Sequence, residues 1–377
     1  MLSFWERESL VTYDVIVVGS GIVGLTTALL YKELHPRKSV LVIERGILPS
    51  GASTKNAGFA CIGSISELEA DLKSESLDAV LEVVEMRKIG LELLKKRVAN
   101  SNVGFQNEDS YELLFDKDIR LVERIAFWNT HLSPMFKTDV FEMAFEQLPV
   151  FGFGDRVKGL IRNNVEGAMD TGKMMRYLTD VALKAGVEIK TGAEVIAVQE
   201  FSTFNKIFIF DRSLNTNIEF RSDLLFVCSN GFTKQLFKDI DIRPGRGQVL
   251  ITQPISQLKI KGIFHFDEGY YYFRNVGDRI LFGGGRNKYK EKEETTEIGI
   301  NNAIIQDLKA HLNSTVLPGT SFKIDMEWAG IMAFGEEKKP IIRQYSDRIF
   351  IGVRLGGMGV AIGSLVAKKL VELSESD

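Results

Sequence analysis

A glycine-rich turn between an apolar run and a helix-like run is the feature that most constrains the fold of this chain. Residues 14–18 (Asp-Val-Ile-Val-Val) form a continuous β-branched run, typical of a parallel strand that is covered on both faces. A Gly-x-Gly-x-x-Gly sequence follows at 19–24, and apolar residues then recur at helical spacing over 22–34. A second buried strand is expected at 40–43. The order of these elements predicts a βαβ unit and an α/β fold.

The spacing of the three glycines is that of a dinucleotide-binding turn. Gly19 permits the tight turn, Gly21 lets the backbone approach a pyrophosphate, and Gly24 lets the helix pack closely on the strand. The amide groups that open the helix, around Ile22 and Val23, then face the phosphate charge. A glycine turn without a nucleotide is the alternative.

An acidic residue at the end of the second strand favours the nucleotide. Glu44 lies 20 residues after Gly24, where its carboxylate can accept hydrogen bonds from both ribose hydroxyls and disfavours a 2′-phosphate. We therefore predict a dinucleotide site that also includes Arg45, the next residue.

The length and composition are those of an ordinary globular protein with room for two structural units. The chain has 377 residues, of which 45% are hydrophobic and 26% charged. The net charge of −3 gives no general attraction to nucleic acid, which is not expected as a partner. No apolar run reaches the roughly 18 residues needed to cross a bilayer, and the charged opening segment lacks the apolar core of a signal peptide. We expect a cytoplasmic protein with no integral membrane segment.

The sequence contains no motif for a metal site. Cys61 and Cys228 lie far apart and form no Cys-x-x-Cys pair, so no disulfide framework or zinc site is suggested, and both are expected to be packed small side chains. The four histidines stand in unrelated contexts without a metal or triad motif.

Helical and strand patterns alternate after the first unit. Residues 64–148 are helical and charged and resemble an insertion, whereas 170–185 predict a capped helix and 187–198 return to a strand pattern. Residues 224–227 predict a buried strand, which ends in small and polar residues where backbone can approach a ligand: Cys228, Ser229, Asn230 and Gly231.

The last third of the chain contains an aromatic segment and a second glycine turn. Residues 246–285 are aromatic and short-stranded, as in an antiparallel sheet. The charged stretch 288–297 is expected to be a solvated loop and helix start. A strand at 349–351 then leads through a glycine-rich turn into a final helix near 373.

These segments together resemble the D-amino-acid oxidase superfamily, which includes glycine oxidase, sarcosine oxidase and D-amino-acid dehydrogenase. The resemblance covers roughly 13–373 and rests on the dinucleotide fingerprint, the segment 51–58 (Gly-Ala-Ser-Thr-Lys-Asn-Ala-Gly), Arg-Gly-Gln at 246–248, Trp-Ala-Gly at 328–330 and the last glycine turn. It implies FAD and a Rossmann-like FAD-binding domain split over 1–80, 150–235 and 326–377. We expect noncovalent binding of FAD, with covalent attachment through Cys61 as the alternative. An α+β substrate domain with an antiparallel sheet is expected at 81–149 and 236–325.

The resemblance also implies which residues hold FAD. Val195 should offer backbone contacts to adenine, and the turn formed by Gly356, Gly357, Met358 and Gly359 should lie near the flavin pyrimidine edge, which becomes negative on reduction. The residues expected along the diphosphate and isoalloxazine are Ser53, Thr54, Lys55, Asn56 and Ala57.

The substrate side departs from the family pattern. Met332 stands where family members place a carboxylate-binding arginine, and Leu355 stands where a Gly-His-Gly histidine is frequent. Arg354 and Arg274 are candidate replacements, because guanidinium groups match carboxylates, with surface ion pairs as the alternative.

Two tyrosines complete the predicted substrate site. Tyr270, Tyr272 and Arg274 project to one face of a strand, where they could line the flavin; packing in the core is the alternative for the tyrosines.

The resemblance implies oxidation of a C–N bond in an amine or amino acid by hydride transfer to flavin N5. The acceptor, oxygen or another compound, is left open by the sequence. A 2-hydroxy-acid dehydrogenase of the same fold and a non-catalytic flavin-binding module are the alternatives.

Overall fold

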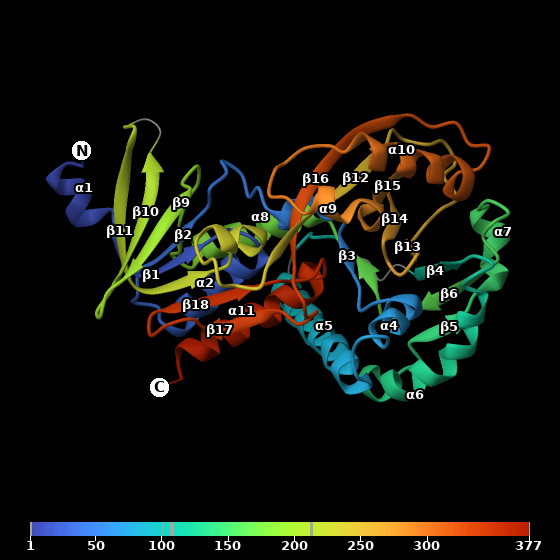
Figure 1. Ribbon diagram of the computed structural model, residues 1–377, viewed down its shortest axis with the longest axis horizontal. Coiled ribbons are helices and arrows are strands. Elements are labelled where there is room, and N and C mark those ends of the chain that lie inside the picture. The colour runs from blue at the N-terminus through green and yellow to red at the C-terminus, as the bar shows by residue number, and fades with distance from the viewer. Residues whose placement is uncertain (1, 100, 106–108, 212–213, 377) are drawn as a thin grey trace.

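The computed structural model describes residues 2–99, 101–105, 109–211 and 214–376. Within these ranges the chain forms two eight-stranded sheets and one two-stranded sheet. Figure 1 shows the first large sheet on the side of the two termini and the second on the opposite side, with the long strands β12 and β16 reaching toward the first sheet. This is the α/β architecture with an additional antiparallel sheet that the sequence predicts.

The first sheet has a parallel centre. Strand β1 pairs in parallel with β2 on one side and with β11 on the other, and β11 pairs in parallel with β18. The predicted strands at 14–18, 40–43, 224–227 and 349–351 are therefore confirmed as the buried centre of this sheet. In sheet order the strands are β17 (Ile341–Gln344), β18 (Ile349–Val353), β11 (Thr216–Val227), β1 (Thr12–Val18), β2 (Val40–Ile43) and β8 (Glu188–Lys190), with β10 (Asn205–Asp211) and β9 (Val195–Glu200) extending from β11.

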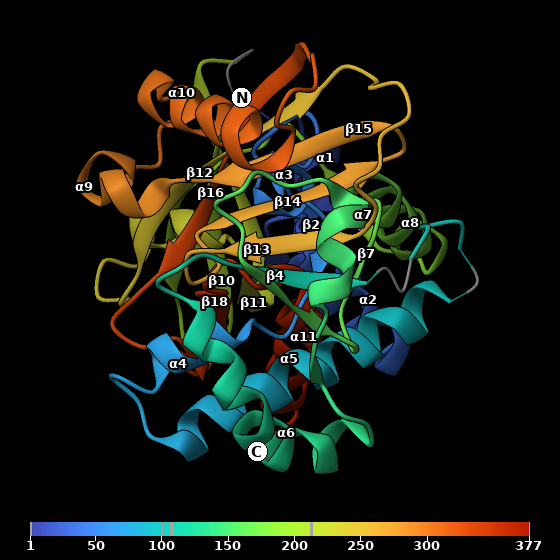
Figure 2. The same cartoon turned by 90° about the vertical axis from the view of Figure 1, so that its right-hand side faces the viewer.

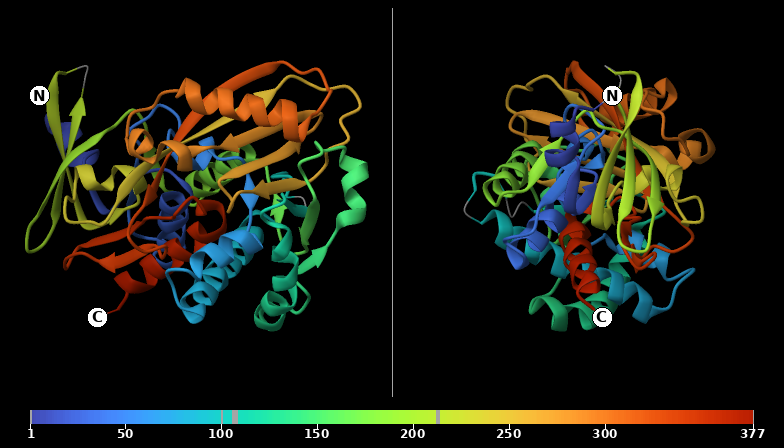
Figure 3. Two further views of the ribbon diagram at one scale, coloured as in Figure 1. Left: turned by 45° about the vertical axis from the view of Figure 1, so that its right-hand side comes forward. Right: turned by 90° about the vertical axis from the view of Figure 1, so that its left-hand side faces the viewer.

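Two apolar helices stack beside this sheet. Helix α2 (Ile22–Leu34) starts directly after the first glycine turn, and α11 (Gly359–Ser374) starts directly after the last one. Helix α11 packs against α2 and against the long α5 (Leu77–Val98), as the views in Figure 3 show. Both helices are apolar around much of their circumference because they are enclosed on several sides.

The second sheet is antiparallel except at one pair of strands. Its strands, in order, are β16 (Ile324–Phe334), β12 (Arg243–Thr252), β15 (Arg279–Gly284), β14 (Tyr271–Val276), β13 (Ile263–Phe266), β4 (Ser110–Leu114), β6 (Gly159–Asn163) and β5 (Phe141–Met143). Figure 2 views this sheet with α10 (Asn302–His311) above it and α5 and α6 (Ile125–Phe136) below. The third sheet pairs β3 (Phe59–Ala60) with β7 (Gly167–Ala168).

The expectation that 64–148 is helical is only partly correct. Helices α4, α5 and α6 lie there, but β4 and β5 join the second sheet, and β4 pairs in parallel with β13. Strand β4 has five residues, all buried, and it contains Glu112. A run this short with a charged residue inside it has no recognisable period, so only its long-range partners identify it as a strand.

The charged stretch 288–297 is largely exposed and contains a helix start, as predicted, and Glu293 is the exception. It begins within η4 (Arg286–Tyr289) and continues into α9 (Lys290–Glu293), where the Glu293 side chain is fully buried. Glu293 accepts hydrogen bonds from Arg246, at 2.7 Å, and from Gln248 and Asn301. Burial of this carboxylate is tolerated because the arginine neutralises it.

The remaining helices cover the sheets and their connections. The predicted capped helix is α8, with the Asp170 side chain accepting from the backbone N–H of Lys173. Within the described ranges, no helix combines the length and apolar character needed to cross a bilayer. The other helical segments are α1 (Phe4–Ser9), α3 (Ala52–Lys55), α4 (Ile65–Asp71), α6 (Ile125–Phe136), α7 (Leu148–Phe151), α8 (Thr171–Lys184), η1 (Ile119–Arg124), η2 (Phe145–Gln147), η3 (Asn230–Gln235) and η5 (Leu312–Val316).

Candidate functional site

One cavity of about 540 Å³ is lined by residues of both large sheets. It receives the ends of β1 and β2 and the turn before α11 from the first sheet, and side chains of β13 and β14 from the second. The predicted site residues in its wall are Gly19, Gly21, Ile22, Val23, Glu44, Arg45, Ser53, Lys55, Asn56, Ala57, Val195, Cys228, Ser229, Gly231, Tyr270, Tyr272, Arg354, Gly356, Gly357, Met358 and Gly359. Three predicted residues, Gly24, Thr54 and Arg274, are not among the described residues that line it.

The first glycine turn is shaped by two contacts that leave no room for a side chain. Gly19 has φ +102°, a conformation that favours glycine. A Cβ on Gly24 would lie 1.8 Å from the carbonyl oxygen of Gly19, so helix α2 can only approach the strand end this closely without one. The Oγ of Ser53 accepts from the backbone N–H of Ile22 at 3.0 Å, which brings α3 to the start of α2.

Glu44 holds its carboxylate at the end of β2 through backbone and hydroxyl donors. Its Oε2 accepts from the backbone N–H and the hydroxyl of Ser20, at 3.1 and 2.9 Å. Its Oε1 accepts from Gly46 N–H at 3.0 Å and from the Ser50 hydroxyl at 3.0 Å. The side chain is 6% exposed, and that exposed part faces the cavity. These contacts fix the carboxylate next to the glycine turn.

The segment 52–58 is a tight local structure. The Asn56 amide donates to the carbonyls of Ala52 and Ser53, and its Oδ1 accepts from Gly58 N–H. Thr54 turns its hydroxyl to the Pro49 carbonyl at 2.7 Å, which explains why it does not line the cavity. Its neighbours Ser53 and Asn56 do.

Two sequence segments far apart in the chain meet beside α3. Arg-Gly-Gln at 246–248 on β12 pairs antiparallel with residues 329–331 on β16, which overlap Trp-Ala-Gly at 328–330, and Gly247 faces Gly330. The Trp328 indole N–H donates to the Lys55 carbonyl at 2.9 Å. A Cβ on Gly330 would lie 2.7 Å from the Lys55 Cβ. This close packing joins the second sheet to the cofactor side of the cavity.

The last glycine turn brings backbone to the same cavity. Gly356 and Gly357 have φ +57° and +83°, and Met358 is the N-cap of α11. Because a helix N-terminus presents unpaired N–H groups and a partial positive charge, this end of α11 can stabilise negative charge in the cavity. Met332, at the position where the sequence departs from the usual arginine, lines the cavity close to Gly357.

The two candidate carboxylate-binding arginines are both held by other groups. Arg354 donates from Nη1 to Asp241 at 2.6 Å and from Nε to the Lys339 carbonyl at 2.9 Å. Arg274 is 8% exposed, and its Nη2 donates to the Met169 carbonyl at 3.1 Å. Neither guanidinium therefore presents all of its donors to the cavity.

Side chains on the aromatic strand β14 alternate between the core of the second sheet and the cavity, as the sequence pattern predicts. Tyr271 and Phe273 pack in the core of the second sheet, whereas Tyr272 lines the cavity together with Tyr270, which precedes the strand. Burial raises the pKa of the Tyr272 hydroxyl to about 12, so it is neutral over the physiological range and can donate a hydrogen bond.

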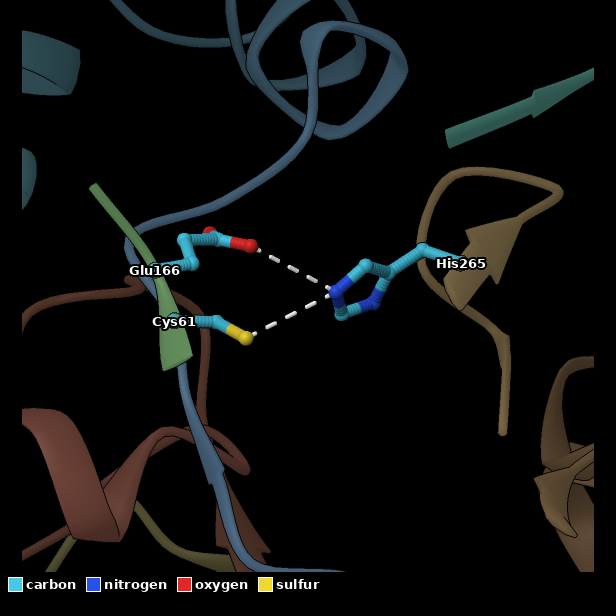
Figure 4. A group of neighbouring side chains, drawn as sticks. All are labelled: Cys61, Glu166 and His265. Carbon is cyan, nitrogen blue, oxygen red and sulfur yellow. Dashed lines mark hydrogen bonds and ion pairs between the residues drawn. The ribbon is translucent and has the colours of Figure 1, made fainter. Parts of the chain in front are cut away.

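Cys61, Glu166 and His265 form a cluster at the cavity wall that sequence reasoning did not find (Figure 4). His265 Nε2 lies 3.6 Å from Glu166 Oε2 and 3.5 Å from Cys61 Sγ. Both cysteines are buried and free, as expected of packed side chains. The three residues come from distant parts of the chain, so spacing gives no signal for the cluster. The pairing of β3 with β7 sets residue 61 beside residue 166, and the pairing of β13 with β4 brings His265 to the same place, where Ser110 on β4 donates to Glu166.

The electrostatics of this cluster favour an ion pair. Burial lowers the pKa of His265, but the Glu166 carboxylate raises it by more, so the net shift is upward. Burial raises the pKa of Glu166, and the contacts with His265, Ser110 and Gly63 outweigh it and bring the value to about 2. Burial also raises the pKa of the Cys61 thiol well above its ordinary range. The cluster is thus an imidazolium, a carboxylate and a neutral thiol near pH 6.

A family model described as "FAD dependent oxidoreductase", the DAO family, matches residues 14–373. The chain belongs to the DAO family. No curated protein matches the sequence. The match covers both large sheets and both glycine turns.

Solved structures with the same fold are distant in sequence. Glycine oxidase from Geobacillus kaustophilus superposes with a TM-score of 0.77 at 17% identity, covering 97% of this chain and 95% of that one. L-proline dehydrogenase from P. horikoshii superposes with a TM-score of 0.75 at 18% identity, covering 97% of this chain and 93% of that one. Iminodiacetate oxidase from Chelativorans sp. BNC1 superposes with a TM-score of 0.75 at 16% identity, covering 95% of this chain and 94% of that one. At these identities the likeness shows the fold.

The residues of this DAO family member fit the FAD that the family implies. The turn at Gly19 and Gly24 has no space for side chains, the Glu44 carboxylate is fixed beside it, and the N-termini of α2 and α11 both open on the cavity. This set offers backbone donors for a pyrophosphate and a carboxylate for ribose hydroxyls.

Proposed function

We propose that this DAO family member oxidises a C–N bond of a small amine or amino acid, with noncovalently bound FAD as the oxidant. The observation that carries the proposal is the single cavity, which runs from the dinucleotide turn at Gly19 to the aromatic strand at Tyr272. A substrate beside Tyr270 and Tyr272 would lie in the same enclosed space as the cofactor residues.

The protein's own contribution is to position the substrate and to stabilise charge. Bound FAD would supply the redox chemistry, by accepting a hydride from the substrate carbon at N5. The turn 356–359 and the N-terminus of α11 would stabilise the negative charge that the reduced pyrimidine edge acquires. Phe59, Tyr272 and Met332 would exclude water around the reacting carbon. Glu44 and the first glycine turn would hold the adenosine side.

The names of the structural neighbours support an amino-acid substrate. They are an oxidase of glycine, a dehydrogenase of L-proline and an oxidase of iminodiacetate. We further propose that the FAD-binding part comprises 1–80, 150–235 and 326–377, because the dinucleotide turn, Val195 and the last glycine turn lie in these ranges. The substrate part would comprise 81–149 and 236–325.

The test is reduction of the purified holoprotein without oxygen. Amino acids, neutral amines and 2-hydroxy acids are added separately, and the loss of the visible flavin absorbance is followed. An amine or amino acid should bleach the flavin with saturation kinetics. Bleaching by 2-hydroxy acids alone, or by no compound of the three classes, would overturn the proposal.

Two further measurements complete this experiment. FAD should be released into the supernatant when the protein is denatured, because noncovalent binding is proposed. Oxygen uptake compared with reduction of an artificial quinone, on the substrate found, distinguishes an oxidase from a dehydrogenase.

A further inference from the structure

Two of the arginines in the cavity wall are engaged by acids of the protein. Arg87 lies 3.1 Å from Glu67 and also donates to the Ile62 carbonyl at 2.6 Å. Arg354 is paired with Asp241 at 2.6 Å. A ligand that sought either guanidinium would have to compete with a contact already made within the fold.

Arg286 differs from both of these residues. It begins η4, directly after the two positive-φ glycines that end β15, Gly284 and Gly285, and it lines the cavity. Among the residues that the structure describes, its guanidinium has no hydrogen-bond or ion-pair partner. Its carbon Cζ lies 3.9 Å from the ring centroid of Phe334, so one face of the planar group is covered by an aromatic ring.

The nearby acid does not neutralise it. Glu293 and Glu294 act on the charge of Arg286 through space, but neither makes an ion pair with it among the described residues. The Glu293 carboxylate is held by Arg246, Gln248 and Asn301. Arg286 is half-buried, and burial lowers the pKa of its guanidinium, although such a group stays charged at any physiological pH. The protein thus keeps a partly desolvated positive charge at the cavity with no direct ion pair among the described residues, which costs free energy unless an anion binds there.

The neighbours of Arg286 place it on the substrate side. Gly285, the residue before Arg286, donates its backbone N–H to the Tyr270 carbonyl at 3.1 Å, which places Arg286 beside the aromatic strand, and Arg286 lines the cavity together with Tyr270 and Tyr272. Two other lining cations, Arg45 and Lys55, also have no ion pair among the described residues. Arg45 follows Glu44 and stacks on Phe232 at 3.5 Å, whereas Lys55 ends α3 and packs against Gly330 on β16. Arg286 is thus a lining cation without an ion pair among the described residues, and it directly follows the contact between Gly285 and Tyr270.

We propose that Arg286 is the anchor for a carboxylate group of the substrate, so that the substrate is an amino acid or a related small carboxylate rather than a neutral amine. A guanidinium that stacks through its face keeps its in-plane N–H groups for a bidentate contact with two carboxylate oxygens. The hydroxyls of Tyr270 and Tyr272, which line the same cavity, can donate further hydrogen bonds to the same group. The statement that the bound carboxylate belongs to a substrate rests on the proposed function. Carboxylate binding itself can be measured without turnover.

The test compares carboxylates with their neutral amides on the FAD-bound protein. Acetate, benzoate and pyrrole-2-carboxylate, and the three matching amides, are titrated while the visible flavin spectrum is recorded, and calorimetry gives the dissociation constants. At least one carboxylate should bind the natural protein more tightly than its amide. Arg286→Met should raise the dissociation constant of that carboxylate by roughly thirtyfold or more and change the dissociation constant of the amide by no more than about threefold. Arg286→Lys should recover only part of the loss, because lysine lacks the planar fork.

Arg343→Met is the matched control, since Arg343 is an exposed arginine on β17 paired with Asp239. It should bind every probe like the natural protein, and all variants should retain FAD and their melting temperature. The anchor is overturned if carboxylates bind no better than amides, if Arg286→Met binds them normally, or if Lys55→Met shows the loss instead.

The same variants separate this inference from the proposed function. If carboxylate binding depends on Arg286 but no amine or amino acid bleaches the flavin, Arg286 is the carboxylate anchor and the proposed oxidation is wrong. If neutral amines bleach the flavin and Arg286→Met does not impair this bleaching, the proposed oxidation holds and the proposed role of Arg286 as substrate anchor is wrong.

Discussion

Arg354 donates to Asp241 across 2.6 Å and holds this contact from a left-handed backbone conformation, with φ +64°. Its backbone N–H donates to the Asn230 side chain at 3.1 Å, and its guanidinium also reaches Glu337 and the Lys339 carbonyl. The residue therefore ties the turn before α11 to the segment 336–339. These contacts indicate a structural role for Arg354, while its role as a substrate anchor stays a prediction.

Replacing Arg354 should reveal the cost of that backbone conformation. Arg354→Ala and Arg354→Gly both lose the ion pairs, but alanine keeps the unfavourable φ, so the alanine variant should be less stable by about 1 kcal/mol. Chemical denaturation of the two variants measures the difference. Equal stability would mean that the turn relaxes when the side chain is removed.

Gly24 should be intolerant of any side chain. In Gly24→Ala the new Cβ would lie 1.8 Å from the Gly19 carbonyl oxygen, so α2 must move away from the turn, at a cost of about 1–3 kcal/mol or more. We expect FAD affinity to fall at least about tenfold, since the phosphate-facing amides move with the helix. Gly172→Ala, in α8 and far less crowded, is the control and should bind FAD normally. Fluorescence titration of the apoprotein gives both affinities.

Glu44→Gln tests the predicted ribose contact. The amide nitrogen of glutamine cannot accept from the donors of Ser20, Gly46 or Ser50, and the charge that favours ribose hydroxyls is lost. FAD affinity should fall by at least about tenfold, because each charge-assisted hydrogen bond contributes roughly 1.5–3 kcal/mol. Melting of the apoprotein shows how much of the effect is local unfolding. An unchanged dissociation constant would show that Glu44 only organises the loop that follows β2.

The pair of Glu166 and His265 should make stability depend on pH. The pKa of Glu166 is lowered from 4.5 to about 2, so its contribution is present above pH 4.5 and is lost as the pH falls toward 2. The pKa of His265 is raised from 6.5, so its contribution is complete below pH 6.5 and is lost as the pH rises through the raised value. The advantage of the natural protein over Glu166→Gln should be largest between these limits, on the order of 3 kcal/mol, and should shrink in alkaline solution.

Denaturation of both proteins at pH 5.5 and pH 9 measures this difference. His265→Gln is the companion variant, and it should lose most of the same pH dependence. A constant difference between the natural protein and Glu166→Gln at the two pH values would show that His265 is neutral throughout and that the two residues share no ion pair.

The sequence by itself determined the parts of the protein that depend on neighbouring residues. The run 14–18, the glycines at 19–24 and Glu44 lie within one βαβ unit, whose strand, turn and helix periods are local, and the structure has each of them as expected. The same holds for α8 with its Asp170 cap and for the alternation of Tyr271 and Tyr272 across β14. A backbone period and a capping residue act over a few positions, so a sequence pattern can reveal them.

The tertiary structure alone decided which charged side chains are engaged and which face the cavity. Arg354 and Arg286 are both arginines beside glycine turns in the sequence, yet the first meets Asp241, 113 residues away, whereas the second meets Phe334 and no acid among the described residues. The cluster of Cys61, Glu166 and His265 and the burial of Glu293 also arise from contacts between distant segments. Burial and charge pairing follow from which segments the fold brings together, and a local pattern carries no information about those partners.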